Sequence, residues 1–118
     1  MAASKTSKTL LTSQSLSAGS SVNATEWDTS TCYGGLAAVK LTNGGSAPTT
    51  APVVKFYVGE STGTKRLLYQ VSGDTVNSSV NDYVCDIPAG AMFVNVTITN
   101  GATNAITVEA YGQELTGI

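Results

Sequence analysis

The sequence predicts an all-β fold, an antiparallel β-sandwich that follows a short flexible N-terminal arm. Short segments of strand-forming residues recur along the 118 residues, and Gly, Pro and Asn residues separate them. Several of these segments alternate apolar and polar side chains with a period of two, and none shows a helical period. These observations predict six to eight strands in one domain. They do not distinguish a jelly-roll from an immunoglobulin-like topology.

The beginning of the chain predicts an arm and an irregular first strand. Residues 1–8 are small, polar and lightly basic, which is typical of a flexible terminus, and residues 9–118 form the sandwich domain. Residues 9–17 are a strand candidate with imperfect alternation, and residues 21–25 are a second one. Trp27 follows in a polar stretch, and we expect it in the core or at the seam between the sheets.

The middle of the chain contains four clearer strand candidates. Residues 43–52 hold two of the three Pro residues, so we expect a loop there that crosses between the sheets. The four segments are residues 36–42, 53–58, 65–72 and 81–87. Their expected inner side chains are Ala37, Val39 and Leu41; Val54, Phe56 and Val58; Leu67, Tyr69 and Val71; and Tyr83, Cys85 and Ile87.

The last third of the chain shows the most regular alternation. Residues 92–99 alternate Met92, Val94, Val96 and Ile98 with more polar neighbours, and the pattern resumes at residues 106–111. Asn100 and Gly101 lie between the two segments and tolerate the positive φ angles of tight turns. The sequence therefore predicts a β-hairpin with one apolar face, which needs a partner sheet to be stable.

The composition bounds the classes of partner. Charged residues make up 12% of the chain, the net charge is −2 and the pI is near 4.8. A low-charge surface suits packing against other copies or a larger assembly, and the absence of a basic patch argues against a nucleic-acid partner. No apolar run is long enough for a membrane helix, and the N-terminus lacks a secretory signal, so we expect synthesis in the cytoplasm of the producing cell and no membrane partner.

The sequence offers no catalytic or metal-binding pattern. It contains no His, which excludes His-based acid–base catalysis, Ser-His-Asp systems and His-ligated zinc. Nucleotide-binding glycine motifs and calcium-loop spacings are also absent. The acids stand singly, as expected for the solvated faces of strands. We therefore predict a protein that is not an enzyme and has no cofactor.

Cys32 and Cys85 are the only cysteines in the chain. One disulfide between them is an option in an oxidising compartment. Free thiols are favoured for a protein made in the cytosol, where disulfides are rare. Neither residue has a His or basic neighbour in sequence that would activate a thiolate.

Several segments together resemble small β-sandwich virion proteins of tailed bacteriophages. They are SLSAGSSVNAT, TCYGG and AAVKLTNGG in the first half of the chain, and IPAGAMFVNVTITNG and AITVEAYGQELTGI at its end. The resemblance covers most of the chain after residue 10, and it is one of strand and turn style rather than of a catalytic motif. It implies a head decoration (cement) protein without enzymatic activity, although some proteins of this group are found in tails.

The resemblance implies that the major capsid protein is the partner and that the protein is located on the capsid surface of the virion. It also implies a homo-oligomer, for which we expect a trimer. The arm and the loop at residues 43–52 provide the candidate contact residues, which are Lys5, Lys8, Gly44, Gly45, Pro48 and Pro52. The alternative is a tail or fibre module that binds a receptor or carbohydrate through exposed aromatic residues.

Overall fold

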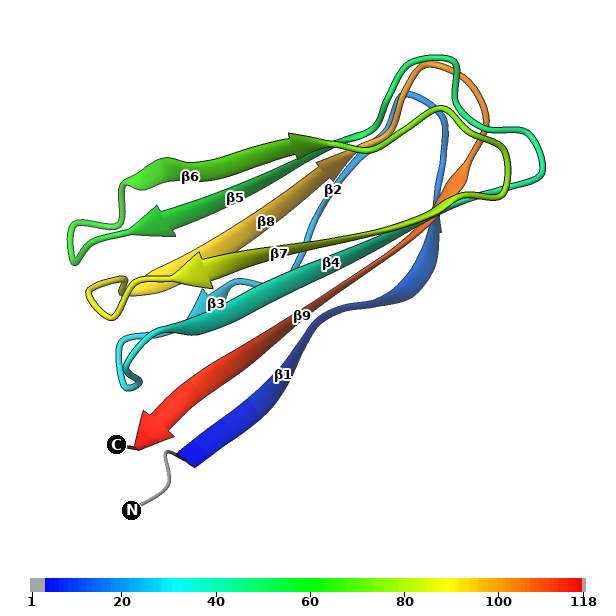
Figure 1. Cartoon of the computed structure of the whole chain (residues 1–118). Helices are drawn as coiled ribbons and strands as arrows, with labels where there is room; N and C mark the ends of the chain where they lie inside the picture. The colour runs from blue at the N-terminus through cyan, green and yellow to red at the C-terminus, as the bar shows by residue number, and fades with distance from the viewer. Residues whose placement is uncertain (1–3, 118) are drawn as a thin grey trace.

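The fold is an all-β sandwich of two antiparallel sheets, as the sequence predicts (Figure 1). The computed structural model describes residues 4–117, which contain nine strands and no helix, so none of them forms a helix that could span a membrane. Sheet A has the order β1 (Ser4–Leu16), β9 (Ile106–Gly117), β4 (Gly35–Asn43) and β7 (Val80–Ile87). Sheet B has the order β2 (Ser21–Asn23), β8 (Phe93–Thr99), β5 (Val53–Gly59) and β6 (Lys65–Ser72), and β3 (Trp27–Asp28) also pairs with β8.

The strand order is that of a jelly roll, which resolves the topology that the sequence left open. Each connection from β1 to β2, β3 to β4, β4 to β5, β6 to β7, β7 to β8 and β8 to β9 crosses from one sheet to the other. Among the described strands, β5 and β6 are the only consecutive pair that hydrogen-bond to each other. The expected crossover at residues 43–52 is confirmed, because β4 lies in sheet A and β5 in sheet B.

The predicted hairpin at residues 92–111 is wrong, although its alternation is correct. Strand β8 pairs with β5, and β9 pairs with β1 and β4, so the two strands lie in different sheets. A period of two identifies the buried face of a strand but does not identify its neighbour. The side-chain amide of the buried Asn100 donates to the carbonyls of Leu16 (3.1 Å) and Asn104 (2.9 Å), and it holds the chain as it crosses the sandwich.

The expected inner face of β6 is correct for two residues and wrong for Leu67. Tyr69 and Val71 lie opposite Phe56 and Val54 of β5, so they point to the inner side. A register shift after Phe56 then places Leu67 on the other side, where 52% of it is exposed. Tyr69 is also 44% exposed, because β6 is an edge strand with little of sheet A above it, although its ring stacks on Phe56 with centroids 6.0 Å apart.

The other predicted inner faces are confirmed except at Met92, which the alternation placed on the buried face but which is 39% exposed just before β8 begins. The expected inner side chains of β4 and β5 are buried, except that Val58 is half-buried. On β7, Cys85 and Ile87 are buried and Tyr83 is half-buried, while Asp82, Val84 and Asp86 are exposed. The buried inner side chains of β4, β5 and β7 belong to one core cluster, which also includes Trp27, Val94, Val96, Ile98, Ile106, Val108 and Ala110.

The first eight residues do not form a flexible arm throughout. Residues 4–8 belong to β1 and pair with residues 112–117 of β9, while residues 1–3 lie outside the described residues. The side chains of residues 4–9 are all exposed, so neither face of this part of β1 needs apolar residues. Its sequence therefore lacks the apolar alternation by which a half-buried strand is recognised. Backbone hydrogen bonds to β9 hold this segment, and such bonds require no particular side chain.

We expect Phe56→Ala to lower the free energy of unfolding by about 3–5 kcal/mol, because it leaves a cavity between the sheets. Phe56 is fully buried in the core cluster. Urea denaturation followed by circular dichroism measures the change. Val76→Ala, in an exposed loop position, is the matched control and should change stability by less than about 0.5 kcal/mol. Equal losses in the two variants would contradict this assignment of the core.

Candidate contact surface

The candidate contact residues lie at opposite ends of the sandwich (Figure 1). Lys5 lies opposite Leu115, near the chain termini. The loop at residues 44–52 begins after Asn43, which pairs with Ile106 at the far end of the same sheet. The structure therefore does not bring the predicted arm and loop residues together into one site.

Within that loop, the two prolines are not available for contact. Pro48 and Pro52 are each less than 2% exposed, whereas Gly44 and Gly45 are exposed. The sequence marked the prolines correctly as outside a strand, but their rings pack inward instead of facing a partner. The expectation that Pro48 and Pro52 contact a partner is therefore wrong, whereas the two predicted glycines are exposed, as are Ser46, Thr49 and Thr50.

Side-chain hydrogen bonds tie the loop to its neighbours. Thr49 donates its backbone N–H to the Thr103 hydroxyl (3.0 Å), and the Thr50 hydroxyl accepts from the N–H of Ala102 (3.0 Å). The Asn104 side chain donates to the carbonyl of Ala47 (3.0 Å). Because these bonds join separate connections, the loops at this end form one ordered cap.

The carboxylate of Asp74 holds the loop between β6 and β7. Hydrogen bonds hold the pKa of Asp74 below its usual range, first those from the side chains of Asn81 and Ser79, then the backbone N–H of Val76 and the amide of Asn43. The four donor–acceptor distances are 2.8–3.1 Å. Residues 4–117 contain no group of three acidic, Cys or His side chains that could hold a metal ion, so Asp74 acts here as a loop-fixing acceptor.

At the other end, the sequence did not predict the buried Glu114. Its Oε1 accepts a hydrogen bond from Nε1 of Trp27 (3.1 Å) and lies 3.4 Å from Nζ of Lys8. Trp27 is buried at the seam between the sheets, as expected, and its ring packs against Gly112, with ring atoms 3.0–3.1 Å from where a Cβ at that glycine would be. The Trp27 ring and Lys8 thus explain why an acid is tolerated in an otherwise apolar face. Lys8 is engaged in this pair and is not free for a partner.

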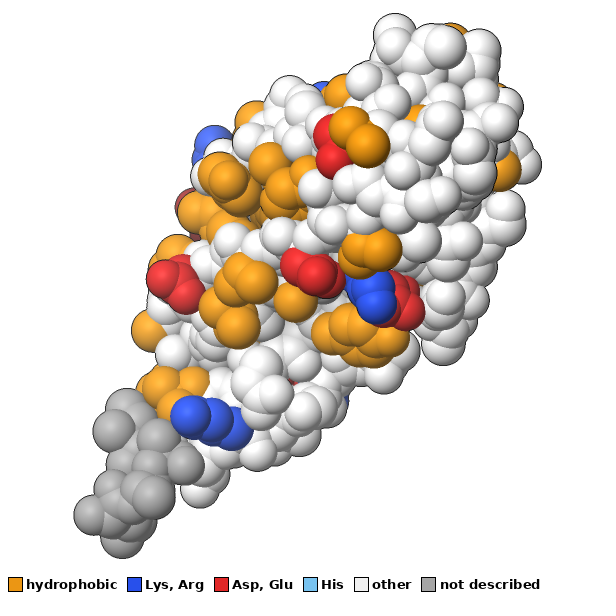
Figure 2. Space-filling model, turned by 45° about the vertical axis from the view of Figure 1, so that its right-hand side comes forward, with side chains coloured by type: hydrophobic (Ala, Val, Ile, Leu, Met, Phe, Trp, Pro, Cys, Tyr) orange, Lys and Arg blue, Asp and Glu red, His pale blue; other side chains and the backbone are white. Residues whose placement is uncertain are grey.

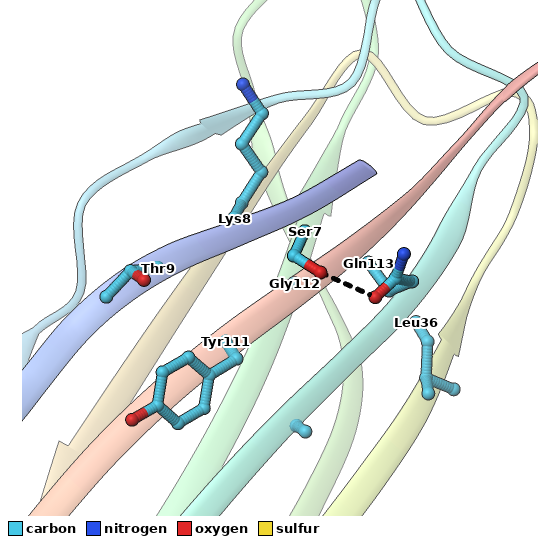
Figure 3. Close-up of a pocket in the computed structure, with 8 residues that line it drawn as sticks. Ser7, Lys8, Thr9, Leu36, Tyr111, Gly112 and Gln113 are labelled. Atoms are coloured by element: carbon cyan, nitrogen blue, oxygen red, sulfur yellow. Dashed lines mark hydrogen bonds between the residues drawn. The ribbon is translucent and has the colours of Figure 1, made fainter. Parts of the chain in front are cut away.

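A shallow depression lies on the outer face of sheet A beside Lys5 and Lys8 (Figure 3). Its volume is about 270 Å³, and it lies among Ser7, Leu36, Tyr111 and Gln113. The Ser7 hydroxyl donates to the Gln113 side-chain oxygen (2.9 Å) and has no base as partner. In Figure 3, Lys8 points to the opposite side of β1 from Tyr111. The polar side chains of Ser7 and Gln113 within the depression satisfy each other.

Both cysteines are buried free thiols in the structure. The thiol of Cys32 lies 3.4 Å from the carbonyl of Thr29 and 3.6 Å from that of Gly34. Burial, and to a lesser extent the charge of Asp86, raises the pKa of Cys85. A raised pKa keeps the Cys85 thiol protonated at neutral pH, so it is a poor nucleophile.

The exposed tyrosines do not form a common platform. Tyr33 lies in the loop before β4, Tyr69 on β6 and Tyr111 on β9. Nζ of Lys65 lies 5.1 Å from the centroid of the Tyr57 ring and covers one of its faces. Stacking of a sugar on several rings at once therefore has no ready-made surface among these residues.

Comparisons with known proteins show the fold alone. No family model matches the chain, and no curated protein matches it. Among solved structures, a chain of the Bacillus endospore appendages, described as disulfide-linked pili, is 14% identical, with a TM-score of 0.58 over 100% of this chain and 93% of that one. A chain of infectious bursal disease virus, Gx strain, is 10% identical with a TM-score of 0.69, over 98% of this chain and 33% of that one.

A family 29 carbohydrate-binding module from Piromyces equi is also similar in structure. It is 11% identical, with a TM-score of 0.54 over 92% of this chain and 91% of that one. The same fold thus occurs in a pilus, in a virus and in a sugar-binding module. The likenesses are consistent with a structural or binding β-sandwich and do not distinguish between these two roles.

We expect Glu114→Ala to lower the free energy of unfolding by about 1–3 kcal/mol, because it leaves the buried Trp27 N–H without an acceptor. Glu114→Gln retains an acceptor oxygen and should lose clearly less. Chemical denaturation measures both, with Glu26→Ala on the surface as control. An Ala variant as stable as the wild type would show that the Trp27–Glu114 hydrogen bond does not hold the seam.

The lowered pKa of Asp74 predicts a loss of stability in acid. Because the unfolded carboxyl binds its proton at higher pH, the stabilisation is complete above its usual pKa of about 4 and is lost as pH falls through the folded value. We expect the difference in unfolding free energy between wild type and Asp74→Asn to shrink between pH 7 and pH 3. Asp86→Asn, at an exposed position on β7, is the control; an unchanged difference for Asp74→Asn would contradict the prediction.

Proposed function

We propose that this chain is a structural virion protein of a tailed phage, a decoration protein that binds the outer surface of the major capsid lattice. It has no enzymatic role in this proposal. The observation that supports it most is the outer face of sheet A, where Leu36, Tyr111 and Val84 are exposed on a regular four-stranded surface. Figure 2 shows hydrophobic side chains interspersed with single acidic and basic ones, as on a contact surface without one dominant charge.

The resemblance in sequence adds to two of the structural likenesses. Both the endospore appendages and the bursal disease virus are assemblies whose subunits contain this fold. The phage-like segments cover most of the chain after residue 10. Together they favour a part that packs into a larger particle over an isolated binding domain.

The proposed mechanism is mechanical. A sandwich placed over a junction between capsid subunits adds buried surface, at roughly 25 cal/mol per Å² of apolar area, that must be exposed again before the subunits separate. The hydrogen-bonded loop cap suits this role, because a contact that resists force gains from groups that are ordered before binding. Lys5, Gly44 and Gly45 are exposed candidate residues, and the half-exposed Lys8 pairs with Glu114 within the chain. The major capsid protein is the proposed partner.

A second candidate function is a tail or fibre module that binds a carbohydrate or receptor. It is favoured by the likeness to the carbohydrate-binding module and by Tyr33, which is half exposed in a loop. Trp27 cannot take part, because it is buried at the seam. If a sugar binds at Tyr33, Tyr33→Ala should abolish sugar binding and leave the fold intact.

Immunogold labelling of purified virions with antibody to this chain tests the proposal. A decoration protein predicts gold over the whole head, at a density that follows the capsid lattice. Gold confined to the tail or its tip would overturn the decoration role and favour the second function. Virions without gold would overturn both phage assignments.

A further inference from the structure

The outer face of sheet A is built in rows of cross-strand neighbours. Glu109 of β9, Lys40 of β4 and Asp82 of β7 lie side by side in one row. In the next row toward the chain termini, Tyr111 of β9, Ala38 of β4 and Val84 of β7 are neighbours. A third row continues with Gln113, Leu36 and Asp86. Each row therefore has its own chemistry: charged, apolar, then mixed.

Lys40 is the one basic residue in the charged row, and it stands between two acids. Even so, the ion pairs within residues 4–117 are Lys8–Glu114 and Arg66–Glu60, and Lys40 approaches neither neighbour to within 4.0 Å. Its side chain is exposed. Lys40 is thus available to an acid that approaches from outside the sheet.

The apolar row is uneven in height. Tyr111 is 40% and Val84 is 55% exposed, and the small Ala38 lies between them. Figure 3 shows the Tyr111 ring on β9 and the Leu36 side chain on β4, on the same face of the sheet. A large side chain beside a small one forms a knob next to a hole, which a second surface with the same pattern can match.

We propose that this face binds the same face of a second copy of the chain, about a two-fold axis that runs parallel to the strands between β9 and β4. This symmetry places β9 of each copy over β4 of the other, row on row. Lys40 then meets Glu109 of the second copy, and Glu109 meets its Lys40. In the apolar row, Tyr111 enters the space over Ala38 of the second copy, and the reverse contact forms by symmetry.

Charge favours a two-fold axis parallel to the strands over one that is perpendicular to them in the plane of the interface. A two-fold axis perpendicular to the strands places β9 over β9 of the second copy and β4 over β4 of the second copy. If it passes through the charged row, Lys40 faces Lys40; if it passes between the charged and apolar rows, Lys40 faces Ala38 and Glu109 faces Tyr111. Like charges or unpaired buried charges are costly at an interface, so the parallel axis is favoured.

The size of the face predicts a weak dimer. The strands of sheet A have 8–13 residues. Four strands about 4.8 Å apart, matched over about eight residues, span roughly 500 Å² per copy. A standard stable interface buries about 800 Å² per partner. Association should therefore depend on concentration and become visible at about 100 µM. This dimer covers the same outer face of sheet A that the proposed function offers to the capsid, so one copy cannot make both contacts with that face at once. The test below uses the free chain without capsids, so it concerns the dimer alone.

Two charge reversals test the geometry when they are mixed. Lys40→Glu alone and Glu109→Lys alone each set like charges against each other in a homodimer, and each should weaken self-association about tenfold or more. In a mixed pair, the new carboxylate of the first variant faces the new ammonium of the second, and the unchanged Glu109 of the first faces the unchanged Lys40 of the second. We expect sedimentation equilibrium to show two separately monomeric variants that form a heterodimer when combined, with affinity near that of the wild type.

The controls separate this geometry from a loss of folding and from a shifted axis. Thermal unfolding of each variant alone establishes that it is folded. An axis between β4 and β7 would instead pair Lys40 with Asp82 of the second copy, so Asp82→Lys mixed with Lys40→Glu would restore association better than Glu109→Lys does. That result would overturn the proposed axis. A wild-type chain that remains monomeric up to about 1 mM, or a mixture without heterodimer, would overturn the dimer itself.

Discussion

The packing of sheet A on sheet B is the interaction on which every other part of this molecule depends. Most paired strands are far apart in the sequence, as β1 and β9 are, so no pair except β5 and β6 is joined by a short turn. The buried side chains of both sheets meet in one cluster. A single strand or sheet would leave half of this cluster in water, and so the strands are stable only together.

Polar contacts close the sides and ends that the apolar core leaves open. The Tyr83 hydroxyl donates to the carbonyl of Ser72 (3.0 Å) and links β7 to β6 across one side. The backbone N–H of Thr25 donates to the carbonyl of Leu10 (2.9 Å) on the other side. Glu114 and Asn100 accept and donate within the two ends. Because these groups satisfy each other, the polar residues of the interior have a structural role.

Because the core occupies the inner sheet faces and polar contacts close the sides and ends, the outer sheet faces remain for contacts with other molecules. The pockets are shallow and the cysteines are buried, while the loops at one end are bound to each other. The outer face of sheet A combines a flat backbone with apolar and oppositely charged side chains in register. The proposed role in covering and joining other surfaces rests on this face.

The sequence by itself determined the class of fold, the strands and most of their buried faces, because side chains in a strand alternate regardless of its neighbours. It also marked Trp27 as a core or seam residue and the loop at residues 43–52 as a crossover. It missed residues 4–8 as a strand, since backbone pairing leaves no pattern in exposed side chains. It also placed Pro48 and Pro52 wrongly on the surface.

Only the tertiary structure decided which strands pair, and therefore which residues share a face. Strands β8 and β9 lie in different sheets, because β8 pairs with β5 while β9 pairs with β1 and β4. No local pattern in the sequence specifies these long-range pairings. The same holds for the contact surface. Lys40, Glu109 and Asp82 are far apart in the chain, and the register of three strands brings them into one row. Alternation is local information, whereas pairing depends on the energy of the whole sandwich.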